Sequence, residues 1–216
     1  MAIKFGNSKG AAIKNKVDAF EFKDGENVVR LVGGVLARYV YWVKGKNNKD
    51  IPIECLSFDR DAEKFLNKEV DHVPNFYPDK KCQWSYAMNC IDPRDGKVKV
   101  INLKKKLFEQ IISASETLGD PTDPDTGWSV VFTRKKTGPL AFNIEYSLSP
   151  FKCKAKALTE EEKALVASSP TIDEKYPRPT SEEILALLEK LANDSDDETT
   201  EEEGDASTRE AVNELN

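Results

Sequence analysis

The sequence predicts a mainly β protein, in which five strands form a small barrel and one helix lies between the third and the fourth strand. Three observations indicate this fold. Much of the chain before residue 150 alternates apolar and polar residues, as half-buried strands do. Clusters of Gly, Pro, Asn and Asp separate these runs and are typical of turns. Residues 104–118 instead carry apolar residues at the spacing of an amphipathic helix.

The first strand is expected to be long and bent. It begins at Val28–Val32, Gly33 and Gly34 allow a bend or bulge, and it resumes over Val35–Val43. A long first strand that coils through a glycine bend is what a small closed barrel requires. Residues 51–58 predict the second strand.

An insertion and a hairpin follow. Residues 59–81 fit no strand pattern, and we expect a short helix over 61–69 within them. Cys82–Cys90 then alternates, with aromatic residues on one face of the strand. Asp92–Gly96 predicts a turn, because Pro fixes φ and Gly adopts positive φ. Residues 98–103 return as the partner strand, directly before the helix.

The last two strands form a closing hairpin. Residues 128–135 and 141–148 both alternate, and Lys136–Pro139 is expected to turn between them. Strands, one helix, and a closing hairpin occur in the order of an OB-fold barrel.

Composition divides the chain into four parts. We predict a basic N-terminal arm over 1–19, the OB-fold core over 20–158 with its insertion, C-terminal helices over 159–192, and a disordered acidic tail over 193–216. The net charge of −6 combines +7 for residues 1–158 with −13 for the remainder. A basic body with an acidic tail favours a polyanionic partner, and the tail can compete with that partner for the basic body.

Several classes of protein are excluded or disfavoured. No run of apolar residues is long enough for a transmembrane helix, and the N-terminus lacks the apolar core of a secretory signal. Four scattered cysteines make no disulfide framework, so a reducing intracellular compartment is expected. We therefore expect no membrane partner.

Catalytic and metal sites are also disfavoured. Structural zinc prefers closely spaced ligands, whereas the candidates Cys55, His72, Cys82 and Cys90 are widely separated. Nothing near the single His72 completes a catalytic triad, and no phosphate-binding glycine loop is present. We therefore predict no enzymatic activity, no metal and no cofactor.

Aromatic and basic residues instead predict a surface that binds single-stranded nucleic acid. Rings stack on bases and cations contact phosphates, so neither contact requires a particular base sequence. Any one ring is as well explained by the barrel interior, but the basic clusters fall at turns and element ends, where they can flank a single groove. Trp42, Tyr41, Trp84 and Tyr86 are the predicted stacking residues. The complete predicted set is Arg30, Arg38, Tyr39, Tyr41, Trp42, Lys44, Lys46, Lys49, Phe76, Tyr77, Lys80, Lys81, Trp84, Tyr86, Lys104, Lys105, Lys106, Arg134, Lys135 and Lys136.

Loose motifs in the chain resemble the single-stranded-DNA-binding, or helix-destabilising, proteins of tailed bacteriophages, especially the T-even-like type. The resemblance covers residues 20–216. Its motifs are Gly25–Leu31, Asp95–Val100, the loop and strand of 119–130, Arg134–Gly138, and Leu158–Glu161 followed by a leucine-rich helix and an acidic end.

The resemblance implies an OB-fold protein that coats and protects single-stranded DNA during phage replication, recombination and repair in the host bacterial cytoplasm. It also implies cooperative self-association through the N-terminal arm and recruitment of replication and recombination proteins by the acidic tail. The T-even type carries zinc on a close cysteine pair that this chain lacks. An RNA-binding or cold-shock-like module is the alternative among binding proteins. A small Mg-dependent nuclease and a virion structural protein are the alternatives from other classes.

Overall fold

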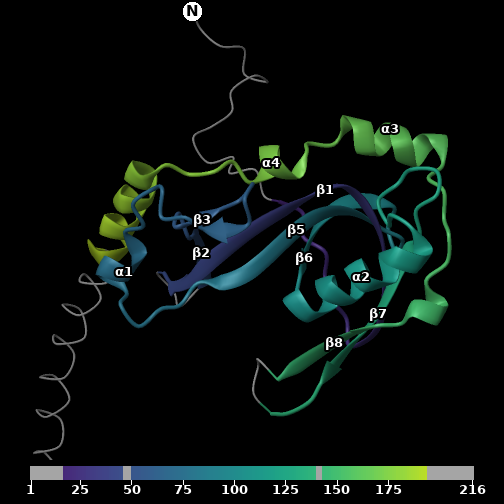
Figure 1. Cartoon of the computed structure of the whole chain (residues 1–216), viewed down its shortest axis with the longest axis horizontal. Helices are drawn as coiled ribbons and strands as arrows, with labels where there is room; N and C mark the ends of the chain where they lie inside the picture. The colour runs from purple at the N-terminus through teal and green to yellow at the C-terminus, as the bar shows by residue number, and fades with distance from the viewer. Residues whose placement is uncertain (1–16, 46–49, 140–142, 194–216) are drawn as a thin grey trace, which may run out of the picture. The chain divides into compact units, whose positions relative to one another are not determined.

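The computed structural model describes residues 17–45, 50–139 and 143–193 (Figure 1). Two compact units emerge. The first consists of residues up to Leu36 together with Tyr86–Pro177, and the second of Ala37–Ser85 together with the chain from Arg178 onward. The boundary passes through two strands, β1 (Gly25–Lys44) and β5 (Gln83–Asp92). The N-terminal arm before residue 17, Lys46 and Lys49, and the tail after residue 193 lie outside the described residues.

The first unit is built on an antiparallel sheet. Its strands follow the order β6-β5-β1-β7-β8, with β6 at Lys97–Leu103, β7 at Ser129–Lys136 and β8 at Ile144–Leu148. The pairs β5–β6, β1–β7 and β7–β8 are antiparallel. Residues 18–20 add a short parallel bridge to β6, with the amide of Phe20 donating to the carbonyl of Val100 at 2.9 Å.

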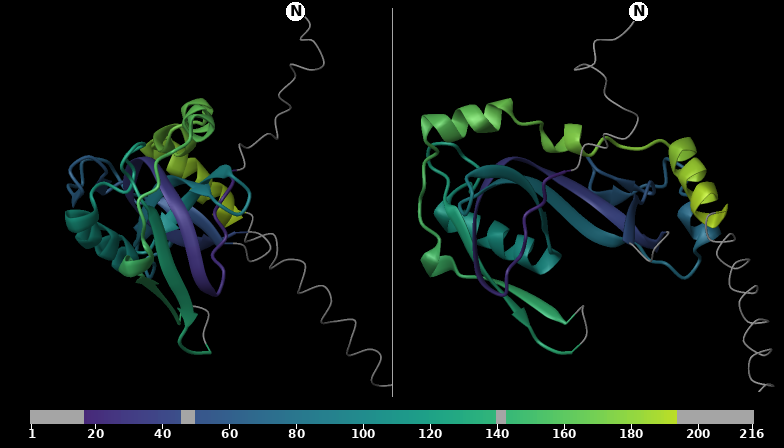
Figure 2. Two further views of the ribbon diagram at one scale, coloured as in Figure 1. Left: turned by 90° about the vertical axis from the view of Figure 1, so that its right-hand side faces the viewer. Right: turned by 180° about the vertical axis from the view of Figure 1, so that it is seen from behind.

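A helix covers part of this sheet. Helix α2 (Lys105–Leu118) lies against the sheet (Figure 2). It buries Leu107 and Ile111, and the ring centroid of Phe108 lies 4.6 Å from that of Tyr86. It ends at Gly119, whose φ of 82° lies in the left-handed region that favours glycine. The predicted helix over 104–118 is thus confirmed, because its apolar face packs on β5.

The chain after β8 packs on the same unit. It forms the 3₁₀ turn η3 (Pro150–Lys152) and the helices α3 (Glu160–Ser168) and α4 (Ile172–Lys175). Thr159 with Glu162, and Thr171 with Glu174, form capping boxes that satisfy the first amides of the two helices. Leu158 packs with Val32 and Ile91, and Ile172 packs with Leu36, Ala87 and Val100.

The second unit has its own core. Strand β2 (Asp50–Glu54) pairs with the C-terminal half of β1, and α1 (Val73–Phe76) follows. Residues 181–193 are helical and place Ile184, Leu188 and Leu191 among the core residues. The other buried members of this cluster are Tyr41, Val43, Ile53, Cys55, Leu56 and Val73.

Three predictions need correction. The described strands do not close into a barrel, because their pairing ends at β6 and β8. The second strand ends at Glu54 instead of residue 58. Residues 61–69 contain no helix: β3 (Phe58–Asp59) and β4 (Lys64–Phe65) form a small hairpin instead. The mainly β character, by contrast, is confirmed.

Local hydrogen bonding explains the missing helix. The Asp59 carboxylate accepts the amides of Asp61 at 3.1 Å and Ala62 at 2.8 Å, which bends the chain into a turn. The rings of Phe58 and Phe65 pair across the hairpin at 5.2 Å and both contact Tyr39. A turn-forming Asp and a cross-strand aromatic pair therefore prevail over a weak helical pattern.

Candidate nucleic-acid interface

A groove in the first unit lies between the start of α2 and strand β8. It has a volume of 450 Å³. We call it the basic groove and define it by its lining residues Lys104, Lys106, Thr137, Ile144, Glu145 and Tyr146.

The register of the closing hairpin places further cations beside this groove. Arg134 pairs with Tyr146, Lys135 with Glu145, and Lys136 with Ile144. Opposed residues of an antiparallel pair lie on the same face of the sheet. Two basic clusters that are about thirty residues apart in the sequence are therefore brought together: Lys104–Lys106 and Arg134–Lys136.

The start of α2 adds to the positive potential. Lys104 is the N-cap residue, no side chain caps the first turn, and that turn contains no acidic residue. Lys104, Lys105 and Lys106 are all exposed. The uncapped amides carry the positive end of the helix dipole, so helix and lysines reinforce each other.

One carboxylate lies within the groove. Lys106 Nζ is 2.6 Å from Glu145 Oε1, and both side chains are about half exposed or more. The hydrogen bond and charge of Lys106, with a contribution from Lys135, lower the pKa of Glu145. An exposed pair of this kind is weak, so a phosphate can replace Glu145 as the partner of Lys106.

The ring of Tyr146 supplies an aromatic surface. It is half-buried and lies 5.3 Å from the ring of Phe22, edge to face. Its hydroxyl is a hydrogen-bond partner of Arg134, and together with the charge of Asp24 this raises the pKa of Arg134. Sequence reasoning missed Tyr146, because alternation in residues 141–148 predicted only a strand and did not show which of its faces is exposed. The register that places Tyr146 opposite Arg134 is the observation that identifies it as part of the basic groove.

The second unit holds a separate set of predicted residues. Tyr39 lies among aromatic rings, 4.8 Å from Phe58, 4.9 Å from Phe65 and 5.8 Å from Trp84. Phe65 is 49% exposed, so this cluster reaches the surface. Trp42 is 42% exposed and lies on the opposite face of β1 from Tyr41.

The remaining candidates of this unit are spread around it. Lys44 pairs with Asp50 at 2.8 Å. Phe76 and Tyr77 pack partly buried against the core, while Lys80 and Lys81 are exposed.

Four predicted residues are buried, which corrects the expectation that they face a ligand. Tyr86 is 1% exposed against α2. Tyr41 is 6% exposed, and its hydroxyl donates to Asp71 Oδ2 at 3.0 Å. Arg38 is 9% exposed.

Arg30 is the fourth of these and has a structural role. It is 2% exposed and donates to the carbonyls of Lys156 at 2.9 Å and Leu31 at 2.7 Å, and to those of Pro121 and Asp123. Burial lowers the pKa of its guanidinium. Arg30 thereby ties the loop before β7 to β1.

Within the described residues there is neither a cluster of metal ligands nor a helix suited to a membrane. No group of three or more His, Cys, Asp and Glu residues in 17–45, 50–139 and 143–193 could hold a metal ion. None of the helices in this part of the chain is both long and apolar enough to span a membrane.

Comparison with known proteins gives a relative in a bacteriophage. The chain is 29% identical, over 236 aligned positions, to a protein of Escherichia phage T5 described as "Probable ssDNA-binding protein". The alignment covers 91% of each chain. This similarity does not point to the T-even type in particular. No protein-family model matches, and no solved structure matches.

Proposed function

We propose that this protein binds single-stranded DNA without reading its sequence, and that it has no enzymatic activity. The observation that carries the proposal is the similarity to the phage T5 protein along 91% of both chains. The basic groove supports it independently, because it brings cations of α2 together with the half-buried Tyr146, whose strand pairs with the basic residues of β7.

The proposed contacts follow from the chemistry of the groove. Lys104, Lys106 and Lys135 contact phosphates, which are common to every nucleotide, and release bound counterions. The ring of Tyr146 contacts a base face, which every base presents. Such contacts give affinity that falls with salt and depends little on sequence.

The strand order fits the fold that we expect for such a protein. We infer that β6-β5-β1-β7-β8, with α2 between β6 and β7, is an OB-type Greek-key barrel left open between β6 and β8. In this reading the basic groove lies at the opening, since Lys104 directly follows β6 and Tyr146 belongs to β8. OB-folds bind oligonucleotides through such loops and strand faces.

We propose that a set of predicted residues in the second unit forms a second contact surface for single-stranded DNA. They are Trp42, Lys44, Lys80 and Lys81, together with the partly buried Tyr39, Phe76, Tyr77 and Trp84, and with Lys46 and Lys49 outside the described residues. We further propose that the protein coats DNA during phage replication, recombination and repair, in the cytoplasm of the host. The acidic tail would then recruit phage proteins, and the arm would support self-association.

The test is a titration of labelled oligo-dT and mixed-sequence oligonucleotides at two salt concentrations. Replacing Lys104, Lys105 and Lys106 with Ala should weaken binding equally for all sequences. The dependence of log affinity on log salt should become shallower by about 0.7 for each lost phosphate contact. Lys190→Ala is the control, because Lys190 is an exposed lysine of the 181–193 helix. It should change neither the affinity nor its dependence on salt.

Two outcomes would contradict the proposal. If the unaltered protein binds no single-stranded DNA, the proposed function is wrong. If it binds but the triple variant keeps the full salt slope, the basic groove is not the site. Single-stranded RNA of the same sequence should bind more weakly; tighter binding to RNA would favour the RNA-binding alternative.

Glu145→Gln provides a change in the opposite direction. It removes the acid from the basic groove and leaves Lys106 without its ion-pair partner. We expect roughly two- to fivefold tighter binding in the same titration. Weaker binding of this variant would show that Glu145 positions Lys106 instead of competing with the phosphate.

A further inference from the structure

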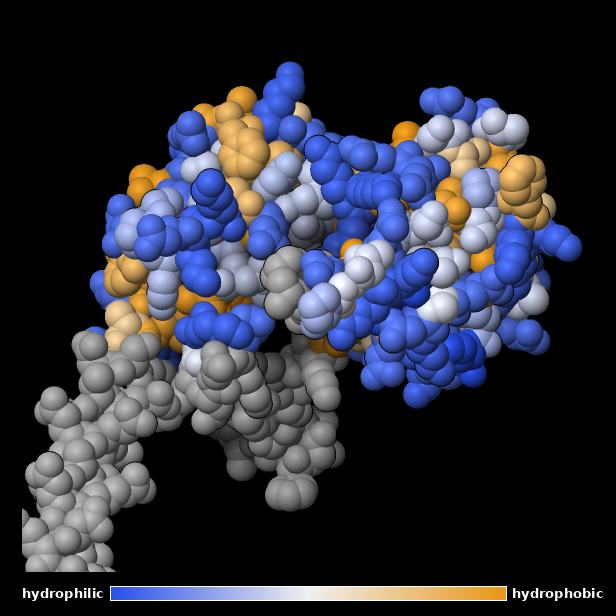
Figure 3. Space-filling model, turned by 90° about the horizontal axis from the view of Figure 1, so that it is seen from below, coloured by the Kyte–Doolittle hydropathy of each residue, from blue (hydrophilic) through white to orange (hydrophobic). Residues whose placement is uncertain are grey.

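Phe151 is the most exposed large apolar side chain among the described residues. Its ring, on the turn η3, is fully exposed (102%). Hydrophobic side chains are scattered over the mostly hydrophilic surface in Figure 3, so exposure alone marks no site. Phe151, however, borders a hollow of 490 Å³ between α2 and β8. We call it the Phe151 hollow; Ala114, Leu118, Leu148 and Pro150 supply its apolar surface.

The turn that carries the ring is held firmly. The amide of Ser149 donates to the carbonyl of Val131 at 2.8 Å, and that of Lys152 donates to Ser149 at 2.9 Å. Cys153, the residue that follows the turn, is buried, and its amide donates to the carbonyl of Pro150 at 3.0 Å. A ring held out from a fixed backbone loses little conformational entropy when it stacks on a ligand.

The Phe151 hollow and the basic groove follow one another along the same seam. On α2, Lys106 of the basic groove and Gln110 and Ala114 of the hollow are spaced four residues apart, so they share one face of the helix. Lys106 bonds to Glu145 at 2.6 Å and Gln110 Oε1 accepts the amide of Leu148 at 2.7 Å, which holds β8 alongside this face. From Lys106 to Ala114 the helix advances about 12 Å.

The chemistry of the hollow suits a nucleotide. None of its lining residues is acidic, and Gln110, Ser113, Thr117 and Ser147 provide polar groups beside its apolar surface. Lys152 and Lys154 follow Phe151 in the chain and are exposed, and Lys152 forms an ion pair with Glu26 at the surface. A base has an apolar face and a polar edge, and the absence of acidic lining residues avoids repulsion of the phosphate beside it.

We propose that the Phe151 hollow is a second stacking subsite for the same single strand that occupies the basic groove. The strand follows the α2–β8 seam, with phosphates at the lysines near the start of α2 and a base against Phe151 near its end. This inference rests on the proposed function.

The test compares Phe151→Ala with the unaltered protein on a thymidine dinucleotide, which spans less than the about 12 Å between Lys106 and Ala114, and on oligo-dT of about 12 nucleotides, within the range of site sizes of OB-folds. The longer strand reaches both sites, so its affinity should fall at least fivefold. The short strand should bind as before. Phe151→Tyr, which keeps the ring, should retain the affinity of the unaltered protein.

Leu165→Ala is the matched control, since Leu165 is a partly exposed apolar residue of α3 outside the hollow. It should change neither affinity. Ultraviolet cross-linking of the longer strand should attach a base to the peptide that contains Phe151.

The outcomes separate this inference from the proposed function. Equal affinity of Phe151→Ala and the unaltered protein for the longer strand would overturn the subsite while leaving the basic groove in place. An equal loss for both lengths would overturn the proposed path along the seam. Absence of any binding by the unaltered protein would overturn the function and the subsite together.

Discussion

Asp92 is the last residue of β5 and stabilises the turn between β5 and β6 in the first unit. Its side chain is fully buried, and it accepts from Arg94 Nη2 at 2.6 Å and from Lys99 Nζ at 2.9 Å. It also accepts the amide of Arg94 at 3.0 Å. The hydrogen bonds from Arg94, aided by Lys99, hold the pKa of Asp92 far below its usual range.

The expected consequence is a pH-dependent effect of Asp92→Asn. Because the folded-state pKa is depressed, the carboxylate stabilises the fold above its unfolded pKa of about 4, and this stabilisation is lost as the pH falls below that value. At pH 7 the variant should lose about 3 kcal/mol of unfolding free energy, because a neutral amide with a single acceptor oxygen cannot satisfy both Arg94 and Lys99 at this buried position. Urea unfolding at pH 7 and pH 3 measures this; a difference that does not shrink at pH 3 would contradict the assignment.

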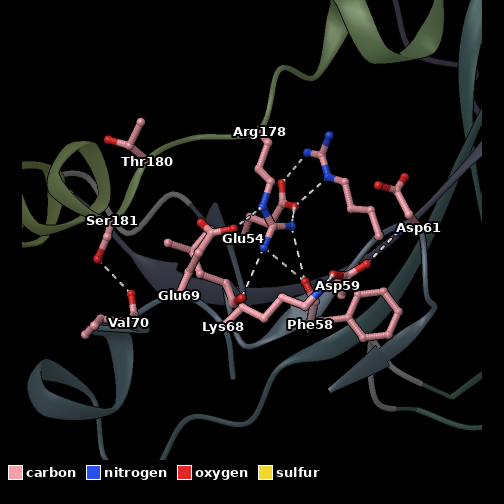
Figure 4. Close-up of polar contacts among 12 residues, drawn as sticks. Glu54, Phe58, Asp59, Asp61, Lys68, Glu69, Val70, Arg178, Thr180 and Ser181 are labelled. Carbon is pink, nitrogen blue, oxygen red and sulfur yellow. Dashed lines mark hydrogen bonds and ion pairs between the residues drawn. The ribbon is translucent and has the colours of Figure 1, made fainter. Parts of the chain in front are cut away.

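Among the elements, the segment from Arg178 to residue 193 completes the second unit. Arg178 donates to the carbonyls of Leu56 at 3.1 Å and Phe58 at 3.2 Å, and pairs with Glu54 and Glu69 (Figure 4). Ser181 Oγ donates to the carbonyl of Val70 at 2.8 Å. These bonds fix the start of the helix whose apolar residues then enter the core.

Neighbouring leucines of this helix test its role. Leu188 is 0% exposed in the core, so Leu188→Ala should cost about 3 kcal/mol through lost burial and the cavity left behind. Leu187 is 36% exposed, and Leu187→Ala should cost less than about 1 kcal/mol. Denaturant midpoints give both values. Similar losses for the two variants would indicate that the helix does not pack as described.

At the scale of the whole molecule, charge of opposite sign is segregated along the chain. Residues 1–158 carry +7 and the remainder −13. We propose that the acidic tail competes with DNA for the cations of the body, since a tethered polyanion acts at a high effective concentration. The sequence of the tail, with ten acidic residues and one Arg in 193–216, supplies the charge for this competition.

Deletion of residues 194–216 tests the competition and leaves the 181–193 helix intact. Affinity for oligo-dT should rise, and its dependence on salt should become weaker, because the tail no longer has to be displaced. A variant in which the acidic residues of the tail are replaced by Asn and Gln separates charge from length and should behave like the deletion. Unchanged affinity in both would contradict the competition.

The mainly β character, the helix of 104–118 and the closing hairpin could all be predicted from the amino-acid sequence. Each of these depends on local spacing: alternation for strands, a 3.6-residue period for the helix, and turn-forming residues between them. The sequence also indicated the basic clusters Lys104–Lys106 and Arg134–Lys136, because charged residues at element ends are commonly exposed; all of them are exposed except Arg134, which is half-buried.

Which side chains face inward, and which segments pack together, became clear from the three-dimensional fold alone. The sequence made Arg30, Tyr41 and Tyr86 candidates for the surface. In the structure Arg30 is bonded to backbone carbonyls, Tyr41 to Asp71, and Tyr86 packs against α2. Conversely, Tyr146 and Phe151 were not among the predicted site residues, yet each borders a hollow beside α2. Burial and neighbours depend on contacts between residues far apart in the sequence, and local periodicity carries no information about those contacts.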